Sequence, residues 1–257
     1  MTIDLRLGRW QEVLMDVSEV STLIVDAPYS ERTHSGHAHD GTMREASRWT
    51  RGDGRKDLPR PQGRRAINYG KFTQELVVEF CAAWSSRVSG WFVSITDHVL
   101  APVWASQLEQ LGRYVFAPLP FVELGSRVRL SGDGPSSWTC WIVVSRPKTR
   151  EFQRWGTLPG AYVDASERKA VVGGKPLGIM RAIVRDYSRP GDLVCDPCAG
   201  GGTTLLAAAI EGRRAVGAEC MPEHFEIAQK RIAKGFTPTL FEDQRPAPEQ
   251  LKLGGGE

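Results

Sequence analysis

One segment of this chain carries a glycine-rich turn of the type that binds nucleosides. It reads Asp196-Pro197-Cys198-Ala199-Gly200-Gly201-Gly202-Thr203-Thr204. A glycine turn between a strand and a helix lets the backbone approach a ligand, and the helix N-terminus offers free N–H groups. Glu219 stands 23 residues after Asp196, close to the roughly twenty expected of a carboxylate that binds a ribose diol. These residues predict a nucleoside cofactor.

The spacing of the glycines argues against NAD. Gly200, Gly201 and Gly202 are consecutive, whereas the dinucleotide fingerprint spaces its glycines as G-x-G-x-x-G. Asp196 would repel a pyrophosphate and suits the positively charged α-amino group of a methionine instead. A phosphate loop at Gly173-Gly174-Lys175 is also excluded, because Pro176 stands where Ser or Thr is needed.

A second segment, Asp26-Ala27-Pro28-Tyr29, could activate an aromatic amine. Such an amine is a poor nucleophile because its lone pair is delocalised into the ring. A carboxylate and a carbonyl that accept its two N–H bonds would localise that pair. The Asp26 side chain and the Ala27 carbonyl offer these acceptors, Pro28 stiffens the turn, and Tyr29 could stack on a flipped base. Taken alone, the tetrapeptide also fits an ordinary turn at the end of a strand.

Both segments follow predicted strands. The apolar run Ser21–Asp26 is typical of a buried strand. Leu193–Asp196 and Ala215–Glu219 are expected to be strands joined by a helix over 203–211, with a further helix over 222–234. A strand–helix–strand unit of this kind requires a parallel sheet. We therefore expect Asp26 and Asp196 to end adjacent parallel strands and to open on one pocket.

The rest of the chain alternates between helical and strand-like patterns. Apolar spacing predicts helices over 72–84 and 102–111 and a helix that begins after Lys175-Pro176. Strands are expected at 90–95, near 114–116 and at 138–145, with a turn over 123–137 and a polar stretch over 146–174. With 41% hydrophobic residues the chain can bury a full core. The fold class is therefore α/β, with a mostly parallel, doubly wound sheet.

Four motifs together resemble those of the β-group of S-adenosylmethionine-dependent DNA amino-methyltransferases. Asp26–Tyr29, Gly174–Pro176, Asp196–Thr203 and Val216–Glu219 occur in the permuted order of that family. The resemblance covers roughly residues 5 to 235. It implies a Rossmann-like methyltransferase fold, S-adenosylmethionine as cofactor and a role for Lys175 in lining the methionine pocket.

Three positions depart from the family pattern. Ala27 replaces a Pro, Cys198 and Gly201 replace Phe and Ser, and Arg9 stands where the family places an acid. Because Arg9 is not an acid, it does not supply the acceptor that the family offers at this position to the cofactor's adenine.

The resemblance also bears on the substrate. Asp rather than Ser at the head of the catalytic motif favours N6 of a flipped adenine in duplex DNA. N4 of cytosine remains the alternative, as do a DNA-binding protein of this fold with little turnover and an RNA or protein methyltransferase.

Two basic segments are expected to bind double-stranded DNA. Residues 30–71 hold ten Lys or Arg against five Asp or Glu, and residues 127–170 hold eight against four. We expect one methyltransferase domain over 1–235, with a basic loop at 30–70, a candidate target-recognition segment at 146–172 and a loose tail at 236–257. Arg146, Lys148, Arg150 and Arg154 alternate along a strand-like run and would form a basic stripe beside the cleft. Phe152 would lie on the same side and Trp155 on the other.

Metal sites and membrane segments are not expected. Cys195 and Cys198 have metal-ligand spacing but no second pair to match, and His34, His37 and His39 fit a solvated or phosphate-facing loop better than a metal centre. No apolar run reaches membrane-spanning length and the N-terminus lacks a secretory pattern, so we expect a cytoplasmic protein of the restriction-modification kind. A homodimer is compatible with the sequence, which identifies no restriction endonuclease partner.

Overall fold

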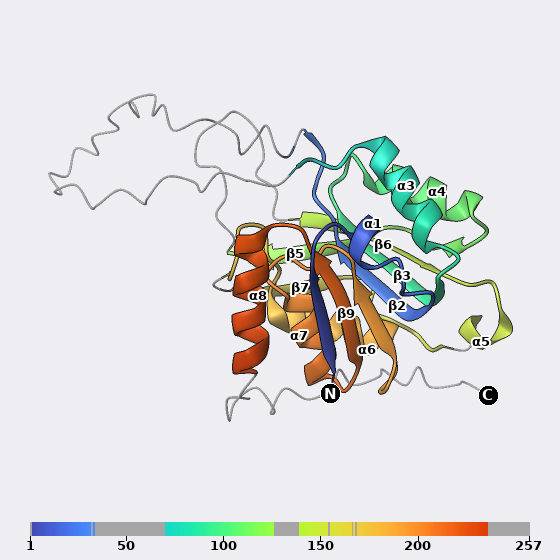
Figure 1. Cartoon of the computed structure of the whole chain (residues 1–257). Coiled ribbons are helices and arrows are strands. Elements are labelled where there is room, and N and C mark those ends of the chain that lie inside the picture. Colours follow the sequence, from blue (N-terminus) through green and yellow to red (C-terminus); the bar gives the residue numbers. More distant parts are fainter. Residues whose placement is uncertain are drawn as a thin grey trace, which may run out of the picture.

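The chain folds around a single nine-stranded sheet with helices on both faces (Figure 1). The computed structural model describes residues 2–31, 33, 70–125, 139–153, 155–165, 167 and 169–235. The strands run in the order β1-β9-β8-β2-β3-β6-β5-β7, and β4 pairs with β6. The strands are β1 (Ile3–Leu7), β2 (Val20–Asp26), β3 (Val88–Thr96), β4 (Tyr114–Val115), β5 (Leu119–Leu124), β6 (Thr139–Arg146), β7 (Tyr162–Ala165), β8 (Leu193–Asp196) and β9 (Arg214–Glu219). The helices are α1 (Trp10–Val13), α3 (Gln74–Trp84), α4 (Ala101–Gln110), α5 (Arg150–Gln153), α6 (Leu177–Tyr187), α7 (Thr203–Ile210) and α8 (Pro222–Lys234).

The sheet is mostly parallel. The five neighbouring strands from β1 to β3 all pair in parallel, and β7 pairs in parallel with β5. Strand β6 runs antiparallel to its partners β3, β4 and β5. The predicted fold class, a mostly parallel sheet wound on both faces, is therefore confirmed. Because β6 is reversed, its last residue, Arg146, lies at the edge where β2 and β3 begin.

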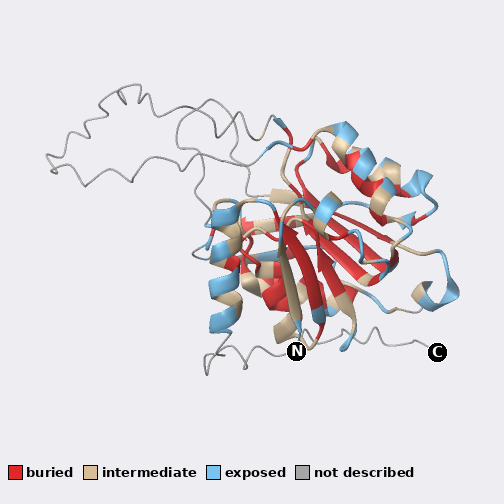
Figure 2. Cartoon of the chain, in the orientation of Figure 1, coloured by how far each residue is buried: buried red, intermediate tan, exposed pale blue. Residues whose placement is uncertain are grey.

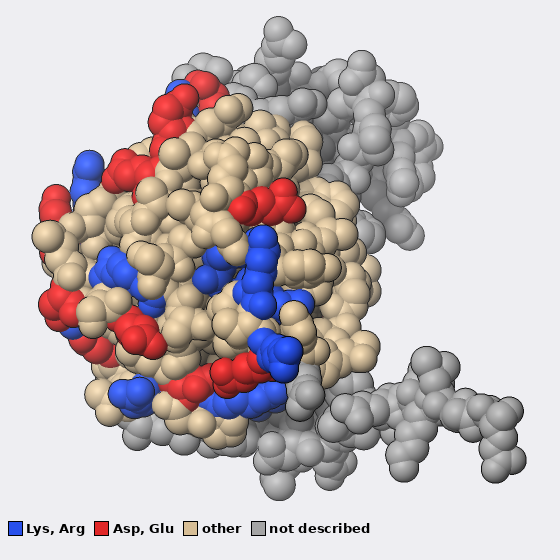
Figure 3. Space-filling model, turned by 90° about the vertical axis from the view of Figure 1, so that its right-hand side faces the viewer, with Lys and Arg blue, Asp and Glu red and all other residues tan. Residues whose placement is uncertain are grey.

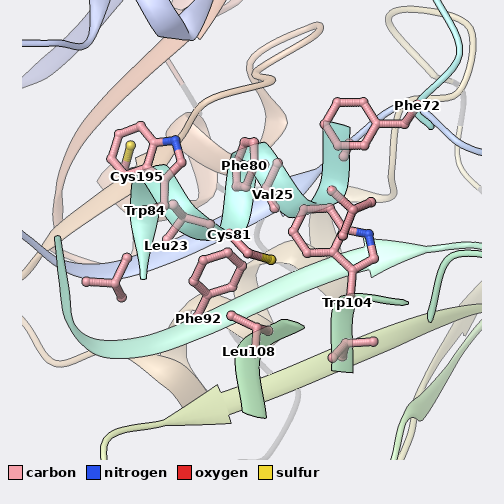
Figure 4. Packing of buried hydrophobic residues seen from close by; sticks show 14 of the residues in the cluster. Leu23, Val25, Phe72, Phe80, Cys81, Trp84, Phe92, Trp104, Leu108 and Cys195 are labelled. Carbon is pink, nitrogen blue, oxygen red and sulfur yellow. The ribbon is translucent and has the colours of Figure 1, made fainter. Parts of the chain in front are cut away.

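An aromatic core fills the space between the sheet and helices α3 and α4 (Figure 4). Thr73 caps the N-terminus of helix α3, and its side chain accepts a hydrogen bond from the Leu76 N–H at 3.3 Å. Its buried positions, Val77, Phe80, Cys81 and Trp84, follow helical spacing and cover one stripe. The Phe80 ring contacts five other aromatic rings, those of Trp10, Phe72, Trp84, Phe92 and Trp104.

Helices α6, α7 and α8 cover the opposite face. The buried residues of α6 include Ile179, Met180, Ile183 and Val184, so one side of the helix is continuously apolar. Helix α7 packs Leu205 and Ala208 into the same core. Figure 2 shows the central strands buried between the two helical layers. The sheet is thus a rigid base whose strand ends are fixed in space.

The sequence predicted most of these elements. The predicted strands at 21–26, 90–95, 114–116, 138–145, 193–196 and 215–219 are all present, with ends that differ by a few residues. So are the helices at 72–84, 102–111, 203–211 and 222–234 and the helix that begins after Lys175-Pro176. Strands β1, β5 and β7 were missed. The tail at 236–257 and residues 34–69 of the basic loop lie outside the described residues, and the division into one domain over 1–235 stays a prediction. In the described part of the chain, no helix has both the length and the apolar character that crossing a membrane requires.

The aromatic contacts of Phe80 predict that this residue contributes strongly to the stability of the packing between α3 and the sheet. Replacing Phe80 by Ala should lower the free energy of unfolding by about 3–5 kcal/mol, because a ring with close partners on all sides leaves a cavity. Val78→Ala on the exposed side of the same helix should change it by less than about 0.5 kcal/mol. Urea unfolding followed by circular dichroism measures both values. Equal losses for the two variants would contradict this account of the core.

Candidate active site

Two carboxylates, Asp26 and Asp196, lie at the ends of neighbouring strands. Strand β2 ends at Asp26, β8 ends at Asp196, and the two strands pair in parallel with Leu23 opposite Cys195. The predicted adjacency of the two strand ends is confirmed. After β8 the chain enters α7 on one face of the sheet, whereas α3, which follows β2 in the described part of the chain, lies on the other face. This divergence is where open α/β sheets bind ligands.

The glycine loop after β8 is held in a conformation that needs glycine. Gly200 and Gly202 have φ values of +52° and +75°, a region that other residues rarely adopt. A Cβ on Gly202 would lie 3.1 Å from the Ala228 Cβ in α8. Arg231, also in α8, donates hydrogen bonds to the Gly201 carbonyl and, at 3.0 Å, to the Thr203 hydroxyl. Arg231 was not predicted as a site residue, because nothing in the local sequence around it points to the loop.

Asp196 is a buried carboxylate held by neutral donors. It is 1% exposed, and its Oδ1 accepts a hydrogen bond from the Cys198 N–H at 3.1 Å. Burial raises the pKa of Asp196 to about 7, against the lowering effect of hydrogen bonds from Thr204 and the Cys198 N–H. The negative charges of Asp26 and Glu219 add to the increase in the pKa. Asp196 is therefore a site where a positive charge would bind favourably.

Glu219 connects the glycine loop to the end of β9. Its Oε2 accepts a hydrogen bond from the Gly200 N–H at 2.8 Å, and its Oε1 accepts one from the Met221 N–H at 2.7 Å. The Glu219 carbonyl accepts the Gly8 N–H at 2.9 Å, which places Arg9, the residue that departs from the family pattern, next to this strand end. The structure thus brings Asp196, the loop and Glu219 together at one edge of the sheet.

Asp26 forms a nearly buried ion pair with Lys175. The Lys175 Nζ lies 2.7 Å from Oδ1 and 2.6 Å from Oδ2 of Asp26, and it also donates to the Gly173 carbonyl at 3.1 Å. The predicted role of Lys175 in lining the methionine pocket stays a prediction. Its ammonium group contacts Asp26, a partner 149 residues away that no local pattern could indicate.

The remaining residues of the tetrapeptide surround this ion pair. The Tyr29 ring centroid lies 5.1 Å from the Lys175 Nζ, and a side-chain hydrogen bond joins Tyr29 to Cys140 of β6. Ala27 is buried against the α3 face, and Pro28 is half-buried. Sequence reasoning missed Cys140, because it lies in an apolar strand pattern with no feature that points to a site.

Asp97, at the end of β3, anchors the segment that follows the tetrapeptide. Its Oδ2 accepts hydrogen bonds from the Ser30 N–H at 3.0 Å, the Ser30 hydroxyl at 2.5 Å and the Thr33 hydroxyl at 2.6 Å. Its Oδ1 accepts the Val99 and Leu100 N–H groups at 3.1 and 3.0 Å. Burial raises the pKa of Asp97, but the hydrogen bonds outweigh burial and lower it overall. The sequence analysis missed this acid as well.

The predicted basic stripe is not formed. Pro147 follows the end of β6, and Arg150 lies in helix α5 rather than in a strand-like run. Arg146 lies over the Tyr114 ring at 4.5 Å, at the edge of the sheet opposite to Asp26. Phe152 and Trp155 stack on each other at 5.5 Å instead of facing apart.

Arg146, Lys148 and Arg150 therefore do not flank Asp26, and Arg154 lies outside the described residues. Figure 3 shows the face on the α5 side, where Lys and Arg are interspersed with Asp and Glu. This face does not carry charge of a single sign.

Among the described residues, no three His, Cys, Asp or Glu side chains lie close enough together to bind a metal ion. His34, His37 and His39 lie outside them.

Comparison with known proteins relates this arrangement to DNA-modifying proteins. A family model described as DNA methylase matches residues 67–230. The YubD methylase of Escherichia coli strain K12 is 34% identical over 59 residues, which make up 23% of this chain and 26% of YubD, so most of that relative's length is not aligned.

Two solved structures share the fold. The M1.HpyAVI–SAM complex has a TM-score of 0.63 at 18% identity and covers 90% of this chain and 100% of its own. The PvuII DNA methyltransferase, described as cytosine-N4-specific, has a TM-score of 0.60 at 13% identity and covers 89% and 86%. At these identities the likeness concerns the fold, and the predicted Rossmann-like methyltransferase fold is confirmed.

The anchoring role of Asp97 predicts a pH-dependent loss of stability. Asp97→Asn should lower the free energy of unfolding at pH 7 by about 2–4 kcal/mol, because buried donors lose an ionised acceptor. The pKa of Asp97 is lowered in the folded state, so its contribution is present above the ordinary pKa of an Asp and is lost as the pH falls through the folded-state pKa. Urea titrations from pH 7 to pH 3 should show the difference between variant and wild type shrinking. Glu109→Gln, on the exposed side of α4, serves as the control; a difference for Asp97→Asn that did not depend on pH would refute the assignment.

Proposed function

The chain belongs to the DNA methylase family whose members act on N6 of adenine or N4 of cytosine, and on that premise we propose that it transfers a methyl group from S-adenosylmethionine to N6 of an adenine flipped out of duplex DNA. The observation that carries this proposal is the parallel pairing of β2 with β8. It sets the carboxylate suited to an amino group, Asp26, beside the carboxylate suited to a cationic nucleoside, Asp196. A methyl group and its acceptor can react only if both are held within contact distance.

The residues around Asp196 fit S-adenosylmethionine. The buried Asp196 carboxylate would pair with the α-amino group of the methionine moiety, while Pro197, Cys198 and Ala199 and the left-handed glycines provide the close backbone approach. The Glu219 carboxylate accepts two backbone hydrogen bonds and interacts with the Cys220 side chain, and we propose that its remaining acceptor capacity binds the hydroxyls of a ribose. When bound, this cofactor supplies an electrophilic methyl group on a sulfonium.

The tetrapeptide would prepare the amino group for attack. Asp26 accepts one N–H bond of the amine, and the Ala27 carbonyl accepts the other, which localises the lone pair on nitrogen. The replacement of Pro by Ala at this position leaves that carbonyl in place. Tyr29 stacks on the extruded base. Most of the rate enhancement would come from positioning, which in favourable intramolecular reactions is worth about 7–11 kcal/mol.

The position of the basic loop in the sequence indicates which segment contacts the DNA. The Arg-rich segment 30–70 directly follows Tyr29 in the sequence, and we keep it as the proposed phosphate-binding loop. We do not assign DNA contacts to residues 146–154, because Arg146 lies where β2 and β3 begin, whereas Asp26 lies where β2 ends.

Transfer of a labelled methyl group to duplex DNA, followed by digestion to nucleosides, tests the proposal. The expected product is N6-methyladenine. N4-methylcytosine would move the chain to the cytosine branch, to which the structurally similar PvuII enzyme belongs by its description. Binding of S-adenosylmethionine without any transfer to DNA, RNA or protein would leave a binding protein with this fold.

If Asp26 binds the amine and Glu219 binds the cofactor, variants of these two residues should impair different steps. Asp26→Asn should lower methyl transfer by about a hundredfold or more, because the acceptor for the amine is weakened, while the cofactor dissociation constant stays near that of wild type. Glu219→Gln should weaken cofactor binding by about tenfold, as expected for the loss of a charged hydrogen-bond acceptor. Isothermal titration and rate measurements separate the two effects, with the exposed Glu223→Gln in α8 as the control. Equal losses of cofactor affinity in both variants would show that this assignment of roles is wrong.

The raised pKa of Asp196, about 7, predicts a pH dependence of cofactor binding. A cationic ligand binds the ionised form of Asp196, so affinity should increase as the pH rises through 7 and be about tenfold weaker one pH unit below the pKa. The same raised pKa means that the folded state holds the proton more tightly than the unfolded chain. The contribution of Asp196 to stability therefore falls as the pH rises from its ordinary pKa towards 7. Calorimetry in two buffers with different ionisation enthalpies should detect proton release on binding, and Asp196→Asn should abolish both the release and the pH dependence.

A further inference from the structure

Lys175 is the most deeply buried cation of the site, and all three of its protons have acceptors. Its side chain is 6% exposed, and its Nζ donates to both oxygens of Asp26 and to the Gly173 carbonyl. Lysine is almost never buried to this extent unless it is paired. Lys175 directly precedes Pro176, the residue before α6. The position of this helix therefore fixes the backbone of Lys175 at a distance from which its side chain reaches Asp26.

The same ammonium group contacts a second residue of the tetrapeptide. The Tyr29 ring centroid lies 5.1 Å from the Lys175 Nζ, within the range of a cation–π interaction. One cation thus touches both the carboxylate proposed to accept the amine and the ring proposed to stack on the base.

The pairing still leaves Asp26 able to accept a ligand. An ionised carboxylate has about four lone-pair sites on its two oxygens, and Lys175 uses one on each. The Asp26 side chain is 22% exposed whereas that of Lys175 is 6% exposed. More of the Asp26 side chain than of the Lys175 side chain is thus exposed, so an amino group would approach Asp26 from the side that Lys175 does not occupy.

The surroundings of Asp26 would otherwise favour its neutral form. Burial raises the pKa of Asp26 more than its basic neighbours lower it, so this pKa lies above the ordinary value of an Asp, and Glu123 of β5 adds to the increase. Asp196 of β8 and the Cys140 thiol of β6 also interact electrostatically with Asp26. On the other side, Lys175 lowers the pKa of Asp26, and Lys169, which is paired with Glu123 at 2.8 Å, lowers it less. A protonated Asp26 would present an O–H donor to an amine that is itself a donor.

We propose that Lys175 is a positioning residue for methyl transfer, which holds Asp26 as an oriented carboxylate and fixes the Tyr29 ring beside it. This inference rests on the proposed function, since the ionised state of Asp26 matters because an amine must be bound. It adds to the expected role of Lys175 in lining the methionine pocket a direct action on the amine-binding carboxylate. If the ion pair were purely structural, it would hold α6 in place, but its loss would not change whether Asp26 is ionised in the reacting complex.

The test compares Lys175→Met, which removes the charge at similar volume, with wild type and with Lys230→Met, an exposed lysine of α8. In wild type, the carboxyl ¹³C resonance of Asp26, assigned with Asp26→Asn, should report an ionised group from pH 5.5 to pH 8. In Lys175→Met the same resonance should titrate within that range. Methyl transfer at pH 7 should fall by about tenfold or more, and the acid limb of its pH profile should move up by about one pH unit or more. The cofactor dissociation constant should change much less than the transfer rate, because Lys175 contacts Asp26 directly and affects Asp196 only through the charge of Asp26.

Two further outcomes decide the proposal. If Lys175→Met does not fold, Lys175→Gln carries the same test, because its amide can still donate to Asp26 but has no charge. An Asp26 that stays ionised in the variant, together with an unchanged pH profile, would overturn the role assigned to Lys175. Because the resonance is measured in the free protein, it reports on Lys175 even if wild type methylates no DNA, so failure of the proposed function is distinguishable from failure of this inference.

Discussion

The parallel pairing of β2 with β8 is the constraint on which the site depends. Because neighbouring parallel strands end at the same edge, Asp26 and Asp196 are brought together although they are far apart in the sequence. The chain then continues to helices on opposite faces, α7 on one side and α3 on the other. The point at which neighbouring parallel strands lead to opposite faces is where open α/β sheets bind ligands. The two apolar cores below the edge make this placement rigid.

Several carboxylates at one edge of the sheet repel one another, so each needs hydrogen-bond donors or a cation. The chain supplies them in different combinations. Asp97 has neutral hydroxyl and N–H donors, Glu219 has backbone N–H groups, and Asp26 has the Lys175 ammonium. Buried polar groups that are satisfied in this way hold their neighbours in a single geometry. The glycine loop is fixed from the other side by Arg231 of α8. The site therefore has a defined shape before any ligand binds.

The sequence predicted the parts of this arrangement that are encoded locally. The apolar strands before Asp26 and Asp196, the glycine loop and the helices after it carry their own patterns. Strand β1 was missed because Asp4 and Arg6 interrupt its apolar run, and β5 because it contains Pro120 and Glu123. The basic stripe was wrong because Pro147 ends β6 and the direction of β6 in the sheet cannot be read from its own residues. The contact of Lys175 with Asp26 and the anchoring by Asp97 depend on the order of strands, so no local pattern reveals them.

The two carboxylates at the paired strand ends differ in one respect that bears on the reaction. Asp26 has a cation from the chain itself, whereas the partners of Asp196 within the described residues are neutral, namely the Thr204 hydroxyl and the Cys198 N–H. Two buried negative charges side by side repel each other, which is why Asp26 adds to the raised pKa of Asp196. A cationic cofactor bound at Asp196 would supply the missing positive charge, and it would also reduce the repulsion felt by Asp26. In the proposed reaction, binding of the cofactor and preparation of the amine-binding carboxylate are then electrostatically coupled, because each carboxylate is easier to keep ionised when its neighbour is neutralised.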